Sequence, residues 1–430
     1  MTWVTVDRIS GYEDEVVQLK GWIANRRSSG KVRFLLVRDG HGTIQCVVGA
    51  HDVAAEAFDL ADRVPYESSI IVTGRVKRDP RSPIGFELAV SDLRLVSEAE
   101  LYPISKKDHG VSFLMDHRHL WLRSSRQAAL MKIRAAVSKA ARDYFDELGF
   151  TAVEAPILTP TACEGTTSLF QVGYFDGTAY LTQSGQLYGE AAAMALGTIY
   201  VFGPTFRAEK SKTRRHLTEF WMIEPEMAFW EFPETIELAE GMICRIVRDV
   251  LEHCAEPLRA LERDVSILEK VTPPFPRITY SEAIDILKEK GLPIQWGDDL
   301  GGDEETALSD AFDRPLFVTH YPAAIKAFYM KRDPHDPRLA LAVDLLAPEG
   351  HGEIIGGGQR EDSLEKLEET IALHGLDRGP LEWYLDLRRY GSVPHAGFGL
   401  GIERCVAWIA GIHHVREAIA FPRLMDRLYP

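Results

Sequence analysis

The chain has 430 residues, 45% of them hydrophobic and 26% charged, which is enough for a large buried core and two or three domains. It lacks an apolar run of about eighteen residues, a secretory signal in residues 1–10 and any zinc-binding spacing among its five cysteines. We therefore expect a cytoplasmic protein with reduced thiols and no membrane segment. The net charge of −15 excludes a general basic coat, so any contact with RNA must use local basic patches.

Residues 1–100 are predicted to form a small β-barrel. A helix is expected at residues 54–61, and turn residues such as Asp39-Gly40 and Pro80 separate the predicted strands. The expected strands are residues 16–24, 32–38, 43–48, 70–76 and 86–95. Five strands with one helix fit a Greek-key barrel of the OB type, a frequent oligonucleotide binder, although other small barrels share the pattern. Residues 16–38 also hold one of the two basic patches and no acidic residue.

Residues 101–121 are polar and are interpreted as a hinge. A helix is expected at 124–148, where Ser124 and Gln127 have the spacing of a capping box and an apolar stripe follows at helical intervals. From residue 122 to 430, strands and helices alternate irregularly, which indicates an α+β domain. Residues 259–317 are more polar and are interpreted as an insertion in this domain.

A basic loop, residues 210–218, joins two predicted strands, residues 199–209 and 219–229. The two-residue period of a strand places Arg207 and Glu209 on one face of the first strand. It places Phe220, Met222, Glu224 and Glu226 on one face of the second strand. Such a face suits nucleotidyl transfer, because an arginine can neutralise a phosphate and a ring can stack on a base. The alternative is a surface hairpin held by salt bridges.

Two glycine-rich stretches complete the pattern. Residues 397–404 lead into a helix in which Arg404 can grip a terminal phosphate, and their glycines permit close approach to a ligand. Residues 352–360 are interpreted as a glycine-rich turn, and the carboxylates of Glu353 and Asp344 nearby suit Mg²⁺ held against phosphates. A purely structural turn is the alternative.

Together these stretches resemble the three signature motifs of class II aminoacyl-tRNA synthetases. Residues 203–209 with 215–220 resemble motif 2, and residues 399–404 resemble motif 3. Gly149-Phe150 with Pro156 resembles motif 1, the dimer element. The helix at 124–148, with its long apolar stripe, and the strand ending at Pro156 are therefore expected to form a dimer interface. An N-terminal barrel in this position is typical of the aspartate/asparagine/lysine subclass, where it binds the anticodon. The resemblance implies an OB-fold barrel followed by a catalytic domain with an antiparallel sheet flanked by helices, in a homodimer.

The resemblance also implies roles for single residues. Arg207 would bind the α-phosphate of ATP, Glu209 the adenine amino group, and Phe220 would stack on adenine. The remaining implied ATP ligands are Arg215, His216, Glu353 and Arg404, with Arg207, Arg404 and Glu353 as the catalytic set. Asp344 and Glu353 would hold Mg²⁺, although aspartyl enzymes usually carry a serine where this chain has Gly356. Gln186 would hold the substrate ammonium, and Glu164 lies in a stretch that resembles the loop closing over the amino acid.

The residues around the amino acid predict asparagine as the substrate. Aspartyl enzymes carry a lysine at the position of Gly189, and an Asp at the position of Glu224. With the lysine absent, Arg360 can donate to a carboxamide oxygen while Glu224 accepts from its NH₂ group. A bound aspartate would place its carboxylate against Glu224, a repulsion of several kcal/mol at low dielectric.

In the barrel, the resemblance places Phe34 as the ring stacked on the central anticodon base, Gln45 as its hydrogen-bonding partner and Arg26 beside them. Without the resemblance, Phe34 would be read as a core residue and Gln45 as a solvated one. The predicted function is ATP-dependent attachment of asparagine to tRNA. The alternatives are an aspartyl enzyme that charges two tRNAs, a non-charging paralogue, and a relative that makes free asparagine.

Overall fold

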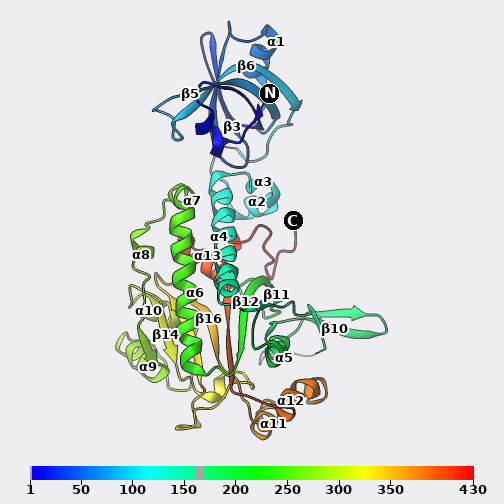
Figure 1. Ribbon diagram of the computed structural model, residues 1–430, viewed down its shortest axis with the longest axis vertical. Coiled ribbons are helices and arrows are strands. Elements are labelled where there is room, and N and C mark those ends of the chain that lie inside the picture. Colours follow the sequence, from blue (N-terminus) through cyan, green and yellow to red (C-terminus); the bar gives the residue numbers. More distant parts are fainter. Residues whose placement is uncertain (1, 106, 161–167) are drawn as a thin grey trace. The chain divides into compact units, whose positions relative to one another are not determined.

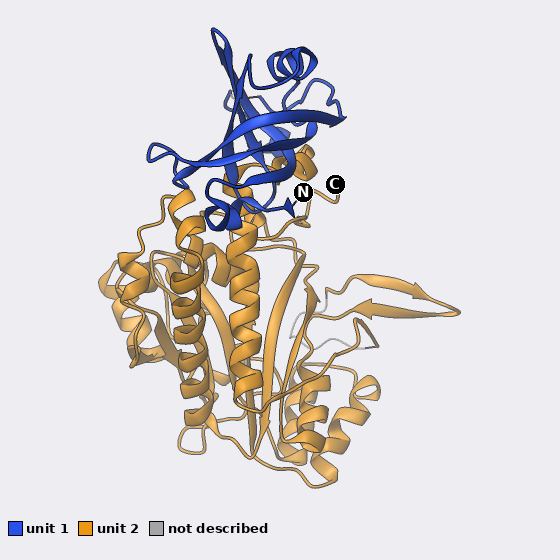
Figure 2. Cartoon of the chain, turned by 45° about the horizontal axis from the view of Figure 1, so that its top comes forward, with its two compact units in different colours: residues 1–114 blue, residues 115–430 orange. Residues whose placement is uncertain are grey.

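The computed structural model describes residues 2–105, 107–160 and 168–430. The chain divides into two compact units, residues 1–114 and residues 115–430, which are coloured separately in Figure 2. Among the described residues, no helix has both the length and the apolar character needed to cross a membrane.

Unit 1 is the predicted OB-type barrel (Figure 1). Its sheet has the order β1-β2-β3-β4-β6-β5, and a further pairing of β2 with β5 closes it. The elements are β1 (Thr2–Trp3), β2 (Val16–Ser29), β3 (Val32–Arg38), β4 (Thr43–Gly49), α1 (Ala55–Arg63), β5 (Ser69–Arg78) and β6 (Phe86–Ser97). Alternate strand residues such as Val17, Leu19 and Ile23 are completely buried in the barrel core. The five expected strands and the helix are present with slightly different ends.

The expected hinge carries two short helices, α2 (Val111–Asp116) and α3 (Arg118–Trp121). The buried Arg118 of α3 donates hydrogen bonds to Gln127 and to the backbone carbonyls of Ile419 and Ala420, which fastens the C-terminal segment. Ser124 caps α4 (Ser125–Glu147) as expected, but the side chain of Gln127 contacts Glu417 instead of completing the capping box.

Unit 2 is built on an eight-stranded sheet with the order β13-β14-β15-β16-β17-β12-β11-β7. Neighbouring strands are antiparallel except at the two edges, where β13 pairs with β14 and β11 with β7 in parallel. The strands are β7 (Thr151–Ala152), β11 (Thr198–Phe206), β12 (Glu219–Ala228), β13 (Arg277–Thr279), β14 (Leu316–Thr319), β15 (Ala342–Ala347), β16 (Gly352–Gln359) and β17 (His395–Gly401). One interpretation is thereby corrected, because the glycine-rich stretch 352–360 is a central strand and not a turn. Residues 259–317, interpreted as an insertion, contain β13 and the start of β14.

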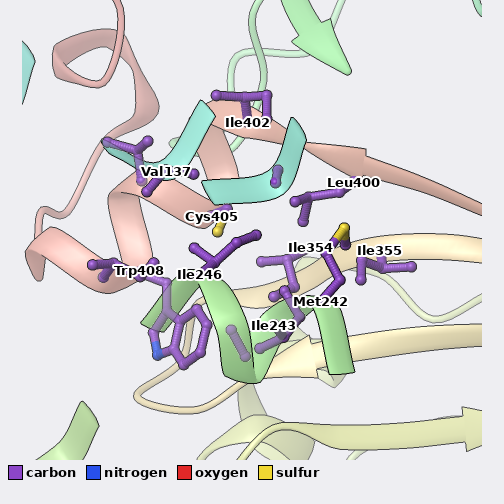
Figure 3. Packing of buried hydrophobic residues seen from close by; sticks show 14 of the residues in the cluster. Val137, Met242, Ile243, Ile246, Ile354, Ile355, Leu400, Ile402, Cys405 and Trp408 are labelled. Carbon is purple, nitrogen blue, oxygen red and sulfur yellow. The ribbon is translucent and has the colours of Figure 1, made fainter. Parts of the chain in front are cut away.

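The core of unit 2 lies between this sheet and three helices, α4, α6 (Phe232–His253) and α13 (Ile402–Ala410). Figure 3 shows Met242 and Ile246 of α6 beside Ile354 of β16 and near Trp408 of α13. The apolar stripe of α4, including Leu130, Ile133, Val137 and Ala141, is buried in this core. These side chains pack inside unit 2. The apolar stripe of α4 therefore does not support a subunit interface on this helix.

The remaining elements surround the sheet. A three-stranded sheet contains β8 (Leu158–Thr159), β9 (Gln171–Tyr174) and β10 (Gly177–Leu181), and β9 and β10 form the hairpin that projects from unit 2 in Figures 1 and 2. The further helices are α5 (Gln186–Leu196), α7 (Ala255–Ala260), α8 (Ser266–Glu269), α9 (Tyr280–Glu289), α10 (Gly302–Ser309), α11 (Leu364–Leu373) and α12 (Glu382–Arg389). Of these, α5 and α10 carry side chains into the site described next.

Candidate active site

A cavity of about 1090 Å³ lies against strands β12, β16 and β17 of unit 2. A smaller pocket of about 420 Å³ adjoins it and is lined by Phe220 and Glu209. As the two-residue period predicted, Phe220, Met222, Glu224 and Glu226 of β12 all line these spaces. Arg207 and Glu209 line them too, but from the loop after β11, because that strand ends at Phe206.

Glycines of β17 make room for the side chains of β12. A Cβ atom at Gly397 would lie 2.3 Å from the carboxyl carbon of Glu226, and one at Gly399 would lie 2.3 Å from the Met222 methyl group. Both distances are far shorter than a van der Waals contact. The glycines of residues 397–404 thus leave room for side chains of the neighbouring strand β12, in addition to any space that they leave for a ligand.

Arginine and histidine side chains gather at one end of the cavity. Arg207, His216 and Arg404 line both the main cavity and the smaller pocket. The guanidinium of Arg207 lies 5.8 Å from the centre of the Phe220 ring. Burial lowers the pKa of His216, and the positive charge of Arg404 lowers it further. This end is suited to polyphosphate, because the guanidinium groups of Arg207 and Arg404 and the His216 ring line the same space.

Each of two cations at this end is paired with a carboxylate. Arg404 Nη1 lies 2.9 Å from Glu353 Oε2, and Lys326 Nζ lies 2.8 Å from Asp344 Oδ2. Burial raises the pKa of the Glu353 carboxyl, but Arg404 and Lys326 outweigh burial and hold it below its usual value. Burial raises the pKa of Asp344 despite the opposing charge of Lys326.

Asp344 and Glu353 face the same point of the cavity. A Cβ atom at Gly356 would lie 2.8 Å from Glu353 Oε1 and 3.4 Å from Asp344 Oδ1. Two carboxylate oxygens converging on a space beside the polyphosphate end fit Mg²⁺, which takes few protein oxygens and keeps several waters. The absence of a side chain at Gly356 leaves that space open.

Arg215 is tied to α10. Its Nη1 lies 2.9 Å from Glu305 Oε2, and its Nη2 donates to the Thr306 hydroxyl at 2.5 Å and to the Gly350 carbonyl at 2.6 Å. The same Glu305 oxygen accepts the backbone N–H of Glu353 at 2.9 Å. Burial and the neighbouring charge of Glu353 raise the pKa of Glu305 to about 7. Arg215 thus joins the basic loop to a segment that had been interpreted as an insertion.

The opposite end of the cavity contains acidic residues of β12. Arg360 is paired with Glu226. Its Nη2 lies 2.5 Å from one carboxylate oxygen of Glu226, and its Nε lies 3.2 Å from the other. Glu224 accepts hydrogen bonds from the Ser184 hydroxyl and from the Gly185 N–H at 2.9 Å. The expected pocket of one arginine and one glutamate therefore contains a second glutamate, Glu226, and burial raises the pKa of that carboxyl.

The N-terminus of α5 fits closely against this end. A Cβ atom at Gly185 would lie 2.7 Å from Val201 and 3.2 Å from Glu224, and one at Gly189 would lie 3.3 Å from Glu226. Gln186, from the same helix, lines the cavity. The remaining residue expected near the amino acid, Glu164, lies outside the described residues.

In unit 1, the structure brings Phe34 and Gln45 together on the surface formed by β3 and β4. Arg27 joins them: its guanidinium lies 4.3 Å from the Phe34 ring centre, and its Nη2 lies 3.5 Å from Gln45 Oε1. Arg27, and not the expected Arg26, is the residue paired with Phe34 across β2 and β3. Phe34 is half-buried at the surface, whereas the neighbouring Leu35 fills the core.

Comparison with known proteins agrees with this geometry. Residues 111–425 match the family of class II tRNA synthetases (D, K and N), and residues 17–96 match the OB-fold nucleic acid binding domain. The chain is 54% identical to an asparagine–tRNA ligase of Pelotomaculum thermopropionicum over 100% of both chains. It is 56% identical to one of Sorangium cellulosum over 99% of both. The chain belongs to the asparagine–tRNA ligases of class II.

A solved structure supports the same assignment. Asparaginyl-tRNA synthetase from Pyrococcus horikoshii, complexed with asparaginyl-adenylate, superimposes with a TM-score of 0.96 at 46% identity, and 99% of each chain is covered. The likeness extends over both units of this class II ligase. The chain is accordingly an enzyme with the predicted fold, an OB-fold domain followed by a class II catalytic domain.

Sequence reasoning missed three ionisable residues of this ligase. Lys326 pairs with Asp344, Glu305 pairs with Arg215, and Glu190 lies behind Gln186. Lys326 and Glu305 come from segments without a recognised motif, and only the clustering of acidic residues around position 303 gave a signal. Glu190 follows Gln186 by four positions on α5, a spacing that would have placed the two side chains together once the helix was recognised.

Proposed function

We propose that the cavity joins ATP and asparagine as asparaginyl-adenylate, releases pyrophosphate, and then transfers the asparaginyl group to tRNA with release of AMP. The observation that carries the proposal is the division of one continuous cavity. Arg207, His216 and Arg404 occupy one end, and Arg360 and Glu224 occupy the other. The two ends are suited to a polyphosphate and to a carboxamide, and the α-carboxylate and α-phosphate would meet between them.

In the activation step, the α-carboxylate of asparagine attacks the α-phosphorus of ATP and the bond to pyrophosphate breaks. Arg207 would neutralise the charge that builds up as two anions approach each other, and the Phe220 ring would hold the adenine. Arg404 and His216 would receive the pyrophosphate. Asp344 and Glu353 would hold Mg²⁺, which neutralises phosphate charge when it is bound.

The amino-acid end would select asparagine by hydrogen-bond polarity. Arg360 uses Nε and Nη2 for Glu226, while its Nη1 faces the Met330 sulfur at 3.8 Å, a weak acceptor. Nη1 can therefore donate to a carboxamide oxygen. Glu224 already accepts two hydrogen bonds, but a carboxylate has about four acceptor sites and can take an NH₂ donor as well. An aspartate would instead bring a third carboxylate to Glu224 and Glu226.

ATP–pyrophosphate exchange with asparagine and with aspartate tests this selectivity. We expect asparagine to support exchange and aspartate to support less than about a hundredth of that rate, since like charges at low dielectric cost several kcal/mol. Comparable exchange with the two amino acids would refute the proposed selection. Exchange with neither would refute activation itself.

We further propose that the surface of Phe34, Gln45 and Arg27 binds the anticodon. A ring with an adjacent guanidinium provides a stacking platform worth about 1–3 kcal/mol per base. Phe34→Ala and Gln45→Ala should reduce aminoacylation efficiency about ten- to a hundredfold and leave pyrophosphate exchange unchanged. The control is Trp3→Ala, which removes an exposed aromatic side chain of the same unit. Phe86→Ala would disturb the barrel core and is not a suitable control. A parallel fall in exchange would contradict the proposal.

We also propose a homodimer and a cytoplasmic location. Because the α4 stripe is used inside the chain, the proposed interface is the motif 1 segment around Pro156, where Ile157 and Leu158 are exposed. The described cysteines Cys46, Cys244, Cys254 and Cys405 are free thiols, which suits a reducing compartment. Sedimentation at micromolar concentration would show a monomer if the dimer proposal is wrong.

A further inference from the structure

A buried carboxylate lies directly behind the residue proposed to hold the substrate ammonium. Gln186 and Glu190 are four positions apart on α5, so their side chains lie on the same side of the helix. Gln186 lines the cavity, whereas the side chain of Glu190 is 0% exposed. Gln186 Nε2 lies 3.0 Å from Glu190 Oε1.

Glu190 is surrounded by polar groups of α12 and β17. The Tyr384 hydroxyl lies 2.9 Å from Oε1, and Arg388 Nη2 lies 2.8 Å from Oε2. His395 Nε2 lies 2.9 Å from Oε2. Burial alone would raise the pKa of Glu190, but the charge of Arg388 and the contact with His395 outweigh it and lower the pKa. Glu190 is therefore an ionised group that can only accept hydrogen bonds.

An acceptor-only neighbour decides which way the Gln186 amide points. The atom of Gln186 that faces Glu190 must be the NH₂ group, so the carbonyl oxygen of the same amide points away from Glu190. An ammonium group has donors and no acceptor, and it needs that carbonyl oxygen. With the amide turned over, its NH₂ group would face the ammonium and the hydrogen bond would be lost.

We propose that Glu190 is a positioning residue that locks the amide of Gln186 with its carbonyl oxygen toward the α-ammonium of the bound amino acid. The inference rests on the proposed function, because it concerns the substrate of that same cavity. Glu190 touches neither ATP nor the carboxamide in this scheme, since Arg360 and Glu224 hold the latter. Its hydrogen bond toward the cavity is made through Gln186, whereas it acts on Arg360 and Glu226 by charge and without a hydrogen bond. The loss of Glu190 should therefore affect the α-amino group more than the carboxamide.

The test compares two ligands that differ only in that group: asparagine, and 3-carbamoylpropanoate, which lacks the α-amino group. In Glu190→Gln, the new amide can donate to Gln186 and allow the Gln186 amide to turn over. We expect asparagine to bind the full-length variant about ten- to a hundredfold more weakly, as for loss of a charge-assisted hydrogen bond. Binding of 3-carbamoylpropanoate should equal that of the wild type. Both dissociation constants are measured by titration calorimetry.

Glu240→Gln is the matched control, because Glu240 on α6 is a largely buried glutamate that accepts the Phe275 N–H outside the cavity. It should leave both dissociation constants unchanged. If Glu190→Gln does not fold, Glu190→Gln combined with Arg388→Gln removes both charges, so that neither is left buried alone. The same difference between the two ligands is expected in that double variant.

Two outcomes overturn the proposal: equal weakening of both ligands, which would show general damage to the pocket, and unchanged binding of asparagine. Neither depends on catalysis. A failure of the proposed function would appear separately, as a wild-type protein that binds neither ligand or gives no exchange with asparagine.

Discussion

The two ends of the active-site cavity both contain paired arginines, but the pairs differ in their access to water. At the amino-acid end, the side chains of Arg360 and Glu226 are 2% and 1% exposed, and those of Arg388 and Glu190 are both 0% exposed. At the phosphate end, the side chains of Arg404 and Glu353 are 27% and 34% exposed, and those of Arg215 and Glu305 are 10% and 16% exposed. The first pairs form a fixed frame, whereas a pair of the second kind can exchange its partner.

This difference follows from what each end must do. The amino-acid end must distinguish ligands of nearly equal size, so its donors and acceptors have to be in place before binding, at the cost of desolvating them. The phosphate end binds a highly charged ligand, and Arg404 can leave Glu353 for a phosphate because a partly solvated pair is worth only about 0–1 kcal/mol. Glu353 would then become available to Mg²⁺.

The largest expected effect is on folding stability at the amino-acid end. Arg360→Met leaves the Glu226 carboxylate buried without its partner, which should lower the free energy of unfolding by about 3–5 kcal/mol. Arg404→Met removes one member of a partly solvated pair and should lower the free energy of unfolding by less than about 1 kcal/mol. Urea unfolding of the two variants and wild type gives both values. Equal losses of unfolding free energy in the two variants would show that the two ion pairs contribute equally to stability.

The next effect is on catalysis at the phosphate end. Arg207→Ala and Arg404→Ala each remove a cation that faces the reacting phosphates, and such groups contribute about 3–4 kcal/mol to transition-state stabilisation. Pyrophosphate exchange should therefore fall by about a hundred- to a thousandfold, with asparagine binding nearly unchanged. Lys212→Ala, an exposed cation of the same basic loop, is the control and should retain full exchange. Near-normal exchange in Arg207→Ala would show that the reacting phosphate lies elsewhere.

The sequence was sufficient for the fold and for much of the cavity, because both depend on local patterns. The alternation in β12 placed Phe220, Met222, Glu224 and Glu226 on one face correctly. It could not assign Arg360 to Glu226, since that pairing joins residues 134 positions apart. Nor could it place Glu305 in the cavity, because residues 259–317 carry no motif and only the tertiary fold brings α10 to β16.

The barrel shows how one residue can shift a prediction. The register of β2 against β3 is interrupted between Ile23 and Asn25, where an extra residue forms a bulge. Without the bulge, Arg26 would lie opposite Phe34. The extra residue moves every later partner by one position, so that Arg27 takes that place. The prediction of Arg26 came from the family resemblance, and neither the resemblance nor the two-residue alternation reveals such an insertion.

The smallest effect is a pH dependence of stability that comes from Glu305 at the phosphate end. Glu305 has an ordinary pKa of 4.5, which burial and the charge of Glu353 raise to about 7 in the folded protein. The folded state therefore binds this proton more tightly than the unfolded state. Its stabilising contribution is complete below about pH 4.5 and is lost as the pH rises through about 7.

Glu305→Gln removes this titration while leaving an amide oxygen for Arg215 and for the Glu353 N–H. Between about pH 5 and 7, the unfolding free energy of wild type should fall relative to the variant, by at most about 1.4 kcal/mol per pH unit. Urea unfolding at several pH values measures the difference, and buried groups common to both proteins cancel. A constant difference across this range would mean that Glu305 is ionised throughout. The carboxylate and Arg215 would then form a permanent ion pair.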